Sequence, residues 1–263
     1  MTDIVTTSDA DLAREIAQQA GRLLLELRAG FDGDLAVKAD ATRLRDTADA
    51  ASHELIVGLL AAARPGDAVL SEEGADDDRR LSADRVWIVD PLDGTWEYGQ
   101  DREDFAVHVA LWERGVLVAG AVDLPAQGIV HTTGTPTLRA DEVPEGRPIR
   151  IVVSRTRPPA AIEAIAAAVS GGLGREVEVV TVGSAGAKTA EVLAGRVDAY
   201  VHDAGLSEWD VAAPAAVAAA GGLRVSHLSG DDIAYNRMPP LVGDLVIGIP
   251  AVADRVVAAV AAL

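Results

Sequence analysis

Two aspartates stand three residues apart directly after an apolar segment, a spacing that suits metal and phosphate chemistry. Residues 87–95 read Trp-Ile-Val-Asp-Pro-Leu-Asp-Gly-Thr, so a buried strand would deliver Asp90 and Asp93 into a loop. A hard divalent cation such as Mg²⁺ prefers oxygen ligands of this kind. Gly94 lets the backbone approach a ligand closely, and free N–H groups of the turn can bind a phosphate. The motif alone is equally compatible with a proline-containing turn in which both aspartates cap a helix.

Two further junctions between a predicted strand or helix and a loop carry acidic residues. Glu72 and Glu73 follow the apolar run 68–70, and the sequence Ser-Glu-Trp-Asp at 207–210 places Glu208 and Asp210 at a helix start. Each junction alone has an ordinary explanation as a helix cap or a solvated surface. Three such junctions in one chain favour a common metal site.

Other catalytic motifs are missing from the sequence. Residues 183–188 lack the glycine spacing of a P-loop, 171–174 do not match the dinucleotide fingerprint, and neither G-x-S-x-G nor H-E-x-x-H occurs. The chain has no cysteine, which excludes thiolate nucleophiles and cysteine-based metal sites. The five histidines show no ligand spacing, and we interpret them as ordinary strand or helix residues: His53, His108, His131, His202 and His227.

The charge balance restricts the expected partners to small soluble ligands. The 263 residues include 41 Asp and Glu against 23 Lys and Arg, which gives a formal net charge of −18. Because binders of nucleic acid polymers and of anionic membranes need basic patches, we expect neither partner. No segment approaches the roughly 18 apolar residues of a membrane span, and residues 1–3 do not begin a signal peptide, so the expected location is cytoplasmic.

The first half of the chain predicts two helices followed by a sheet. Apolar spacing and Ser8 as a cap predict a helix over 9–29, and a second helix starts near Asp46 or Thr47 and ends at 64–66. Short strands follow at 68–70 and 85–89. Alternating segments separated by turns then predict an antiparallel meander over 105–112, 115–123 and 127–132.

A stretch rich in proline, glycine and acidic residues at 141–146 divides the chain into two predicted halves, 1–145 and 146–263. In the second half, strands at 149–154, 177–182 and 197–202 alternate with helices, of which one is opened by Pro158 and Pro159, one by residues 183–188 and one spans 210–220. The fold class is therefore α/β, with an α+β first half and an α/β second half. A terminal helix with Val256, Val257 and Val260 faces either the core or a homodimer partner, so a monomer and a homodimer both remain open.

Three blocks of the sequence together resemble the inositol monophosphatase superfamily of metal-dependent, commonly lithium-sensitive phosphatases. The blocks are Leu-Ser-Glu-Glu at 70–73, the segment 87–95, and Trp-Asp-Val-Ala-Ala at 209–213, and they span most of the chain in the expected order. The resemblance implies an αβαβα layered fold, with an antiparallel sheet in the first half and a mixed sheet in the second. The two halves would meet at the metal site.

The resemblance also implies roles for individual residues. Glu72, Asp90 and the carbonyl of Leu92 resemble the ligands of a first Mg²⁺, and Asp90, Asp93 and Asp210 resemble those of a second. Glu72 would also assist a loosely held third ion. Thr95 and Asp49 resemble the pair that takes a proton from the attacking water, and the N–H groups of Gly94 and Thr95 would bind phosphate. Asp46 stands where the family usually has threonine, which weakens the assignment of Asp49.

Two local patterns resemble the CysQ-type branch of this superfamily. Residues 94–98 fit its Gly-Thr-x-Glu-aromatic pattern, and 207–210 fit its Ser-Glu-Trp-Asp. This branch removes the 3′-phosphate of adenosine 3′,5′-bisphosphate, and of the related sulfated nucleotide, in sulfate assimilation. The resemblance implies further contacts to the substrate from Gly183, Ser184, Lys188, Asp203 and Glu208.

Two other functions remain as alternatives. An inositol-1-phosphate or fructose-1,6-bisphosphate phosphatase would use the same metal ligands, because these do not encode the alcohol. A non-catalytic metal-binding or nucleotide-binding regulator would keep the fold without turnover. The presence of Thr95 and Asp49 beside the ligands argues against the regulator, since binding alone needs no group that activates water.

Overall fold

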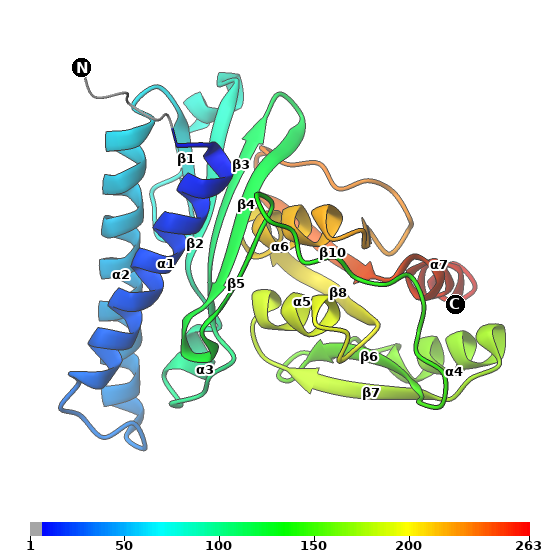
Figure 1. Ribbon diagram of the computed structural model, residues 1–263. Helices are drawn as coiled ribbons and strands as arrows, with labels where there is room; N and C mark the ends of the chain where they lie inside the picture. Colours follow the sequence, from blue (N-terminus) through cyan, green and yellow to red (C-terminus); the bar gives the residue numbers. More distant parts are fainter. Residues whose placement is uncertain (1–6) are drawn as a thin grey trace.

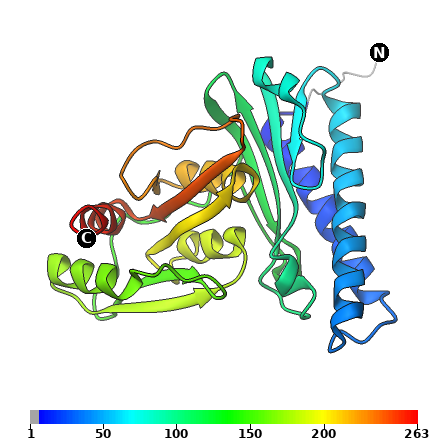
Figure 2. The ribbon, with the colours of Figure 1, turned by 180° about the vertical axis from the view of Figure 1, so that it is seen from behind.

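The computed structural model describes residues 7–263 and consists of five layers (Figures 1 and 2). Helices α1 (Asp9–Ala29) and α2 (Lys38–Ala63) cover the outer face of a first sheet, and α5 (Ala185–Leu193) and α6 (Glu208–Ala220) lie between this sheet and a second one. Helices α4 (Ile162–Leu173) and α7 (Pro250–Val260) cover the far side of the second sheet. The αβαβα arrangement that the resemblance implied is confirmed.

The first sheet has five strands in sequence order. Three hairpin-connected strands form the predicted meander, but β1 pairs with β2 in parallel, so the sheet is not purely antiparallel as expected. β2 also continues through Asp93, beyond the predicted end near residue 89. The bounds are β1 (Ala68–Ser71), β2 (Arg85–Asp93), β3 (Ala106–Glu113), β4 (Val116–Leu124) and β5 (Ile129–Thr132), with the short helices η1 (Asp78–Ser82), α3 (Thr95–Tyr98) and η2 (Pro125–Gln127).

The second sheet is mixed, with the order β7-β6-β8-β10-β9. The predicted strands at 149–154 and 177–182 are confirmed, whereas the third runs further, to Ser207. The helix predicted to open at Pro158 and Pro159 begins three residues after them. The bounds are β6 (Ile149–Ser154), β7 (Val177–Val182), β8 (Ala199–Ser207), β9 (Arg224–Ser226) and β10 (Leu241–Gly248).

The two N-terminal helices differ in how well their starts were predicted. The side chain of Ser8 accepts a hydrogen bond from the backbone of Asp11 at 3.1 Å, and α1 begins where expected. α2 begins at Lys38, eight residues before Asp46, so its predicted start was wrong. Its N-cap, Val37, makes no side-chain cap, and the alanines and arginines that follow are good helix formers without an apolar pattern.

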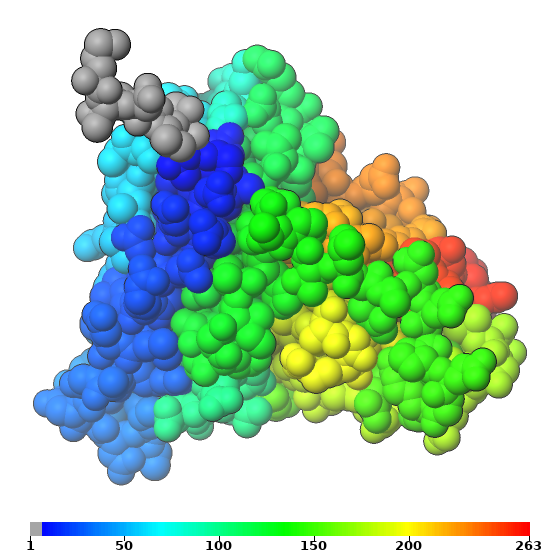
Figure 3. All heavy atoms as spheres, viewed as in Figure 1, coloured from blue at the N-terminus to red at the C-terminus, as the bar shows by residue number. Residues whose placement is uncertain are grey.

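The first sheet separates two hydrophobic cores, because successive side chains along its strands point to opposite faces. On β2, Trp87 and Val89 face α1 and α2, while Val86 and Ile88 face the inner helices. The inner core combines these residues with others from the second sheet and from α7, including the fully buried Val256, so the halves of the chain pack into one body (Figure 3). Within residues 7–263, no helix is long and apolar enough to cross a membrane. Residues 1–3, on which the expectation about a signal peptide rests, lie outside the described part.

Candidate active site

Alternation along β2 places Asp90 on the inner face of the first sheet, where the layers meet. Asp90 follows Val86 and Ile88 on this face and is 1 % exposed. Asp93 stands at the end of the same strand, and Asp210 lies in the first turn of α6, where its carboxylate accepts a hydrogen bond from the backbone N–H of Ser207 at 2.6 Å. One carboxylate oxygen from each aspartate lies within 4.8 Å of the other two. The strand and the helix thus bring together three carboxylates from distant positions in the sequence.

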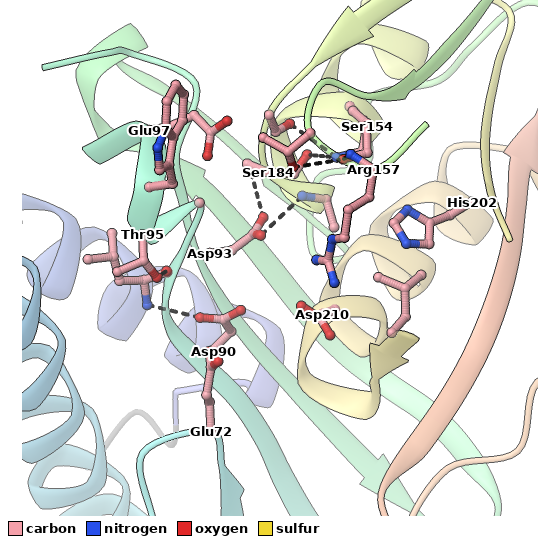
Figure 4. A pocket seen from close by; sticks show the side chains of 18 of the residues that line it. Glu72, Asp90, Asp93, Thr95, Glu97, Ser154, Arg157, Ser184, His202 and Asp210 are labelled. Carbon is pink, nitrogen blue, oxygen red and sulfur yellow. Dashed lines mark hydrogen bonds between the residues drawn. The ribbon is translucent and has the colours of Figure 1, made fainter. Parts of the chain in front are cut away.

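These carboxylates line a cavity of about 240 Å³ between the two halves of the chain (Figure 4). Glu72 reaches it from the end of β1, and the α3 turn forms one wall. The opposite wall comes from the end of β6 and the loop after it, from the start of α5, and from β8. The lining residues are Glu72, Asp90, Leu92, Asp93, Gly94, Thr95, Trp96, Glu97, Ser154, Thr156, Arg157, Gly183, Ser184, Ala185, Lys188, Tyr200, His202, Leu206 and Asp210.

The carboxylates of the cavity repel one another. Burial and the charges of Glu72 and Asp93 raise the pKa of Asp90 well above its usual value. Burial and the charge of Asp93 raise the pKa of Asp210 to about 6. Glu72 is exposed as a whole residue, yet desolvation of its carboxylate and the charge of Asp210 raise its pKa to about 7. A divalent cation would supply the missing positive charge, and its preferred ligands are oxygens of this type. The donor set therefore fits a metal site.

Asp93 differs from its neighbours because the start of α5 stabilises its charge. It accepts hydrogen bonds from the Ser184 hydroxyl at 2.5 Å and from the backbone N–H groups of Ala185 at 3.1 Å and Gly186 at 2.7 Å. Burial opposes ionisation, but the His108 ring and these donors outweigh it and hold the pKa of Asp93 below its usual value. Asp93 is thus fixed in its charged form.

The turn after β2 begins with Gly94, the glycine that the sequence placed at the predicted phosphate site. Gly94 has φ +86°, and a Cβ at this position would lie 3.2 Å from the carbonyl oxygen of Asp104, so glycine is required for both conformation and space. Gly94 and Thr95 both line the cavity beside the carboxylates.

Comparisons with known proteins agree with this architecture. The model of the inositol monophosphatase family matches residues 6–261. A 3′-phosphoadenosine 5′-phosphate phosphatase of Mycobacterium bovis is 44% identical over 253 residues, which cover 92% of this chain and 89% of the relative. The chain belongs to the inositol monophosphatase family.

This member of the inositol monophosphatase family is also similar to proteins of the CysQ group. The 3′(2′),5′-bisphosphate nucleotidase CysQ of Escherichia coli K12 is 29% identical over 238 residues, covering 86% of this chain and 93% of the relative. The crystal structure of CysQ from Bacteroides thetaiotaomicron superposes with a TM-score of 0.77 at 28% identity, over 94% of this chain and 98% of that one. The family is a metal-dependent hydrolase family, and the acidic cluster of this member can hold a metal ion.

The structure brings together most of the residues that the sequence analysis predicted for the metal and substrate site. Ten of them line the cavity: Glu72, Asp90, Leu92, Asp93, Gly94, Thr95, Gly183, Ser184, Lys188 and Asp210. Asp49, Asp203 and Glu208 are not among its lining residues. The sequence had suggested substrate contacts for the last two.

Glu208 and Asp203 bind protein backbone instead. Glu208 is fully buried, and its carboxylate accepts hydrogen bonds from the backbone N–H groups of Asn236 at 2.7 Å and Arg237 at 2.6 Å. Asp203 is exposed and accepts one from the N–H of Ala160 at 3.1 Å. The Ser-Glu-Trp-Asp motif therefore contributes Asp210 to the cavity, while its glutamate holds a neighbouring loop.

Asp49 is a buried residue of α2. Burial and the charge of Glu73 raise its pKa to about 8, and its Oδ1 has no hydrogen-bond partner among residues 7–263. The Thr95 hydroxyl donates to the carbonyl of Leu92 at 3.0 Å, so the predicted pair with Asp49 is not hydrogen-bonded in this conformation.

Two lining residues, Arg157 and His202, were missed by the sequence reasoning, and so was His108, which contacts Asp93. A single arginine in a loop carries no periodic signal, and the two histidines stand in apolar strands without ligand spacing. The one usable sign was the position of Arg157 in the loop three residues after the predicted strand 149–154. Both histidines lie in strands, within the interpretation as ordinary strand or helix residues, but His202 lines the cavity and His108 contacts Asp93.

Proposed function

We propose that this protein is a Mg²⁺-dependent phosphatase that removes the 3′-phosphate of adenosine 3′,5′-bisphosphate. The names and the 44% identity of the mycobacterial relatives support this substrate. The proposal extends to the 3′-phosphate of the sulfated nucleotide, and thereby to sulfate assimilation. Inositol-1-phosphate and fructose-1,6-bisphosphate are the competing substrates on the same scaffold.

The cavity carboxylates are the proposed ligands of two Mg²⁺ ions, with Asp90 shared between them. Asp93 and Asp210 would complete the ligands of one ion, and Glu72 with the Leu92 carbonyl those of the other. Glu72 would also assist a third, more weakly bound ion. When bound, such cations would supply an activated water near neutral pH and would stabilise the charge of the leaving oxygen. The unneutralised charge of the carboxylates supports this assignment.

Residues of the α3 turn are the proposed groups for phosphate and proton handling. The N–H groups of Gly94 and Thr95 hold the phosphoryl oxygens, and Ser184 and Gly183 line the opposite wall. Thr95 passes the proton of the attacking water towards Asp49. Burial and the charge of Glu73 raise the pKa of Asp49 to about 8, which keeps it mostly protonated at pH 7, and the positive charge of cations bound beside Glu72 would favour the carboxylate form that accepts the proton.

The observation that favours a bisphosphate substrate is the guanidinium of Arg157. Arg157 is exposed, lines the cavity beside Asp210, and has no ion pair or side-chain hydrogen bond among residues 7–263 (Figure 4). Once cations neutralise the carboxylates, this guanidinium is free to bind an anionic group at some distance from the reacting phosphate. A second phosphate would satisfy it, and inositol-1-phosphate has none.

The test compares phosphate release in Mg²⁺ from adenosine 3′,5′-bisphosphate, adenosine 3′-monophosphate, inositol-1-phosphate and fructose-1,6-bisphosphate. We expect kcat/KM to be highest for the nucleotide bisphosphate. In Arg157→Ala, kcat/KM for the bisphosphate should fall about 10- to 100-fold, because a charge-assisted hydrogen bond is lost. The value for the 3′-monophosphate should change less than about threefold, since it lacks the group that Arg157 binds.

A matched control is Arg114→Ala, which removes an exposed arginine of the β3–β4 hairpin that pairs with Asp84 and does not line the cavity. It should leave all four values unchanged. A preference for inositol-1-phosphate or fructose-1,6-bisphosphate would overturn the substrate assignment. No release from any of the four would favour a non-catalytic regulator.

A further inference from the structure

His108 occupies an unusual position on β3, at the centre of the first sheet. Its side chain is completely buried and follows the inner-face alternation of Ala106 and Ala110. Its direct cross-strand partner on β2 is Asp90. The imidazole therefore lies in the layer that contains the carboxylate cluster, although it is not a lining residue of the cavity.

The two ring nitrogens of His108 reach two different segments of that cluster. Nδ1 lies 3.2 Å from the carbonyl oxygen of Trp209, the residue before Asp210. Nε2 lies 3.1 Å from Oδ2 of Asp93, at the distance of an ion pair but without the geometry of a hydrogen bond. The Trp209 carbonyl and the Asp93 carboxylate are both acceptors, so the ring has an acceptor beside each of its nitrogens. The ring thus spans the gap between the end of β2 and the start of α6.

The surroundings fix the ring in this place. A Cβ at Gly186 would lie 2.4 Å from Nε2 and 2.8 Å from the Ala106 side chain, so the first turn of α5 packs directly against the imidazole. This same turn donates two backbone N–H groups to Asp93. Asp93 is consequently held by α5 on one side and by the His108 ring on the other.

We propose that His108 is a positioning residue that sets the spacing of Asp93 and Asp210 for cation binding. Asp93 comes from a strand of the first half, and Asp210 from a helix of the second half. The direct side-chain bridge through His108 would keep both carboxylates at the separation that one cation requires. Partners that orient metal ligands commonly contribute 10- to 100-fold to metal affinity.

The inference rests on the proposed cation site but does not depend on the identity of the substrate. Its test therefore measures binding of Mn²⁺ to the full-length, metal-free protein, by electron paramagnetic resonance of the free ion. His108→Asn places an amide near the position of Nδ1, so it can keep the contact to Trp209 and loses the contact to Asp93. His108→Gln reaches towards Asp93 and gives up the contact to Trp209. We expect each variant to bind Mn²⁺ about tenfold more weakly than wild type.

A matched control is His131→Gln, which changes another buried histidine of the first sheet whose Nδ1 bonds the Thr137 hydroxyl. A thermal melt of each metal-free variant measures the loss of stability alone, and only the His108 variants should combine this loss with weaker Mn²⁺ binding. Wild-type affinity in either His108 variant, or an equal loss in His131→Gln, would overturn the bridging role. If the wild-type protein itself bound no Mn²⁺, the proposed metal site would be wrong, and the role of His108 would be wrong with it.

Discussion

The ammonium of Lys188 donates hydrogen bonds to the carbonyl oxygen of Ser184 at 2.6 Å and to that of Gly183 at 3.2 Å. Lys188 is 3 % exposed, and burial lowers its pKa to about 8 despite the nearby charge of Asp93. The loop that it binds is the one from which Ser184 donates to Asp93. The lysine at the cavity wall therefore acts on the α5 start, and through it on a proposed metal ligand.

This arrangement predicts that Lys188→Met lowers the activity on both nucleotide substrates to the same extent. Because the ammonium holds the loop, its loss should lower kcat/KM about equally for adenosine 3′,5′-bisphosphate and for adenosine 3′-monophosphate, by about tenfold. Steady-state kinetics with both substrates measure this. A loss confined to the bisphosphate would instead place Lys188 on the second phosphate.

A second prediction concerns Asp90→Asn. The amide keeps the shape of the side chain but removes the charge shared between the proposed cations, so phosphate release should fall by at least about 10³-fold. Because Asp90 is buried among like charges that raise its pKa, the metal-free variant should melt at the same temperature as wild type or higher.

The control for this variant is Asp78→Asn, an exposed position in η1, which should change neither property. Turnover by Asp90→Asn at a wild-type rate would contradict the shared-ligand assignment. A large drop in its melting temperature would show instead that the Asp90 charge stabilises the fold.

The cavity carboxylates were predictable because local sequence fixes their surroundings. An apolar strand that ends in Asp-Pro-Leu-Asp-Gly directs Asp90 and Asp93 through alternation and a left-handed glycine, both of which depend on neighbours in the sequence. The meander and α1 were predictable for the same reason, since turns and a serine cap mark their ends.

Residues whose roles depend on distant partners were not predictable in this way. The motif around Glu208 identifies the residue, but only the fold shows that loop 236–237 comes to meet its carboxylate. His108 likewise gains its contacts from α6, about a hundred positions later. The early start of α2 was not predicted, because its first residues have helix propensity but no capping residue marks where the helix begins.

A third prediction tests an ion pair that joins the two halves of the chain. Arg155, after β6, donates to Glu97 of α3 at 2.8 Å and to Asp104 at 2.6 Å. The Glu97 side chain is 7 % exposed, so Arg155→Ala leaves a nearly buried carboxylate without its partner. Chemical denaturation should show a loss of about 2 kcal/mol in the free energy of unfolding.

The comparison for this pair is Arg150→Ala, which breaks the exposed pair with Glu178 on the same sheet. We expect a loss below about 1 kcal/mol there, because solvent screens exposed charges. Equal losses in the two variants would mean that Arg155 makes no special contribution to holding the halves together.

The last prediction concerns Asp123, a buried carboxyl on β4 that does not line the cavity. Its carboxylate packs on the backbone of α1, where a Cβ at Gly21 would lie 2.1 Å from Oδ2. Burial raises its pKa to about 7, which the charge of Arg22 only partly offsets. The folded state thus binds a proton that the unfolded chain releases near pH 4, so stability is lost as the pH rises from about 4 to about 7.

Asp123→Asn keeps the shape and removes this titration. Its free energy of unfolding should match that of wild type near pH 4 and exceed it at pH 8 by on the order of 3 kcal/mol. Urea denaturation of both metal-free proteins at pH 4, 6 and 8 isolates the contribution, because every other carboxylate is shared and cancels in the difference. A difference that stays constant across this range would show that Asp123 ionises as easily in the folded protein as in the unfolded chain.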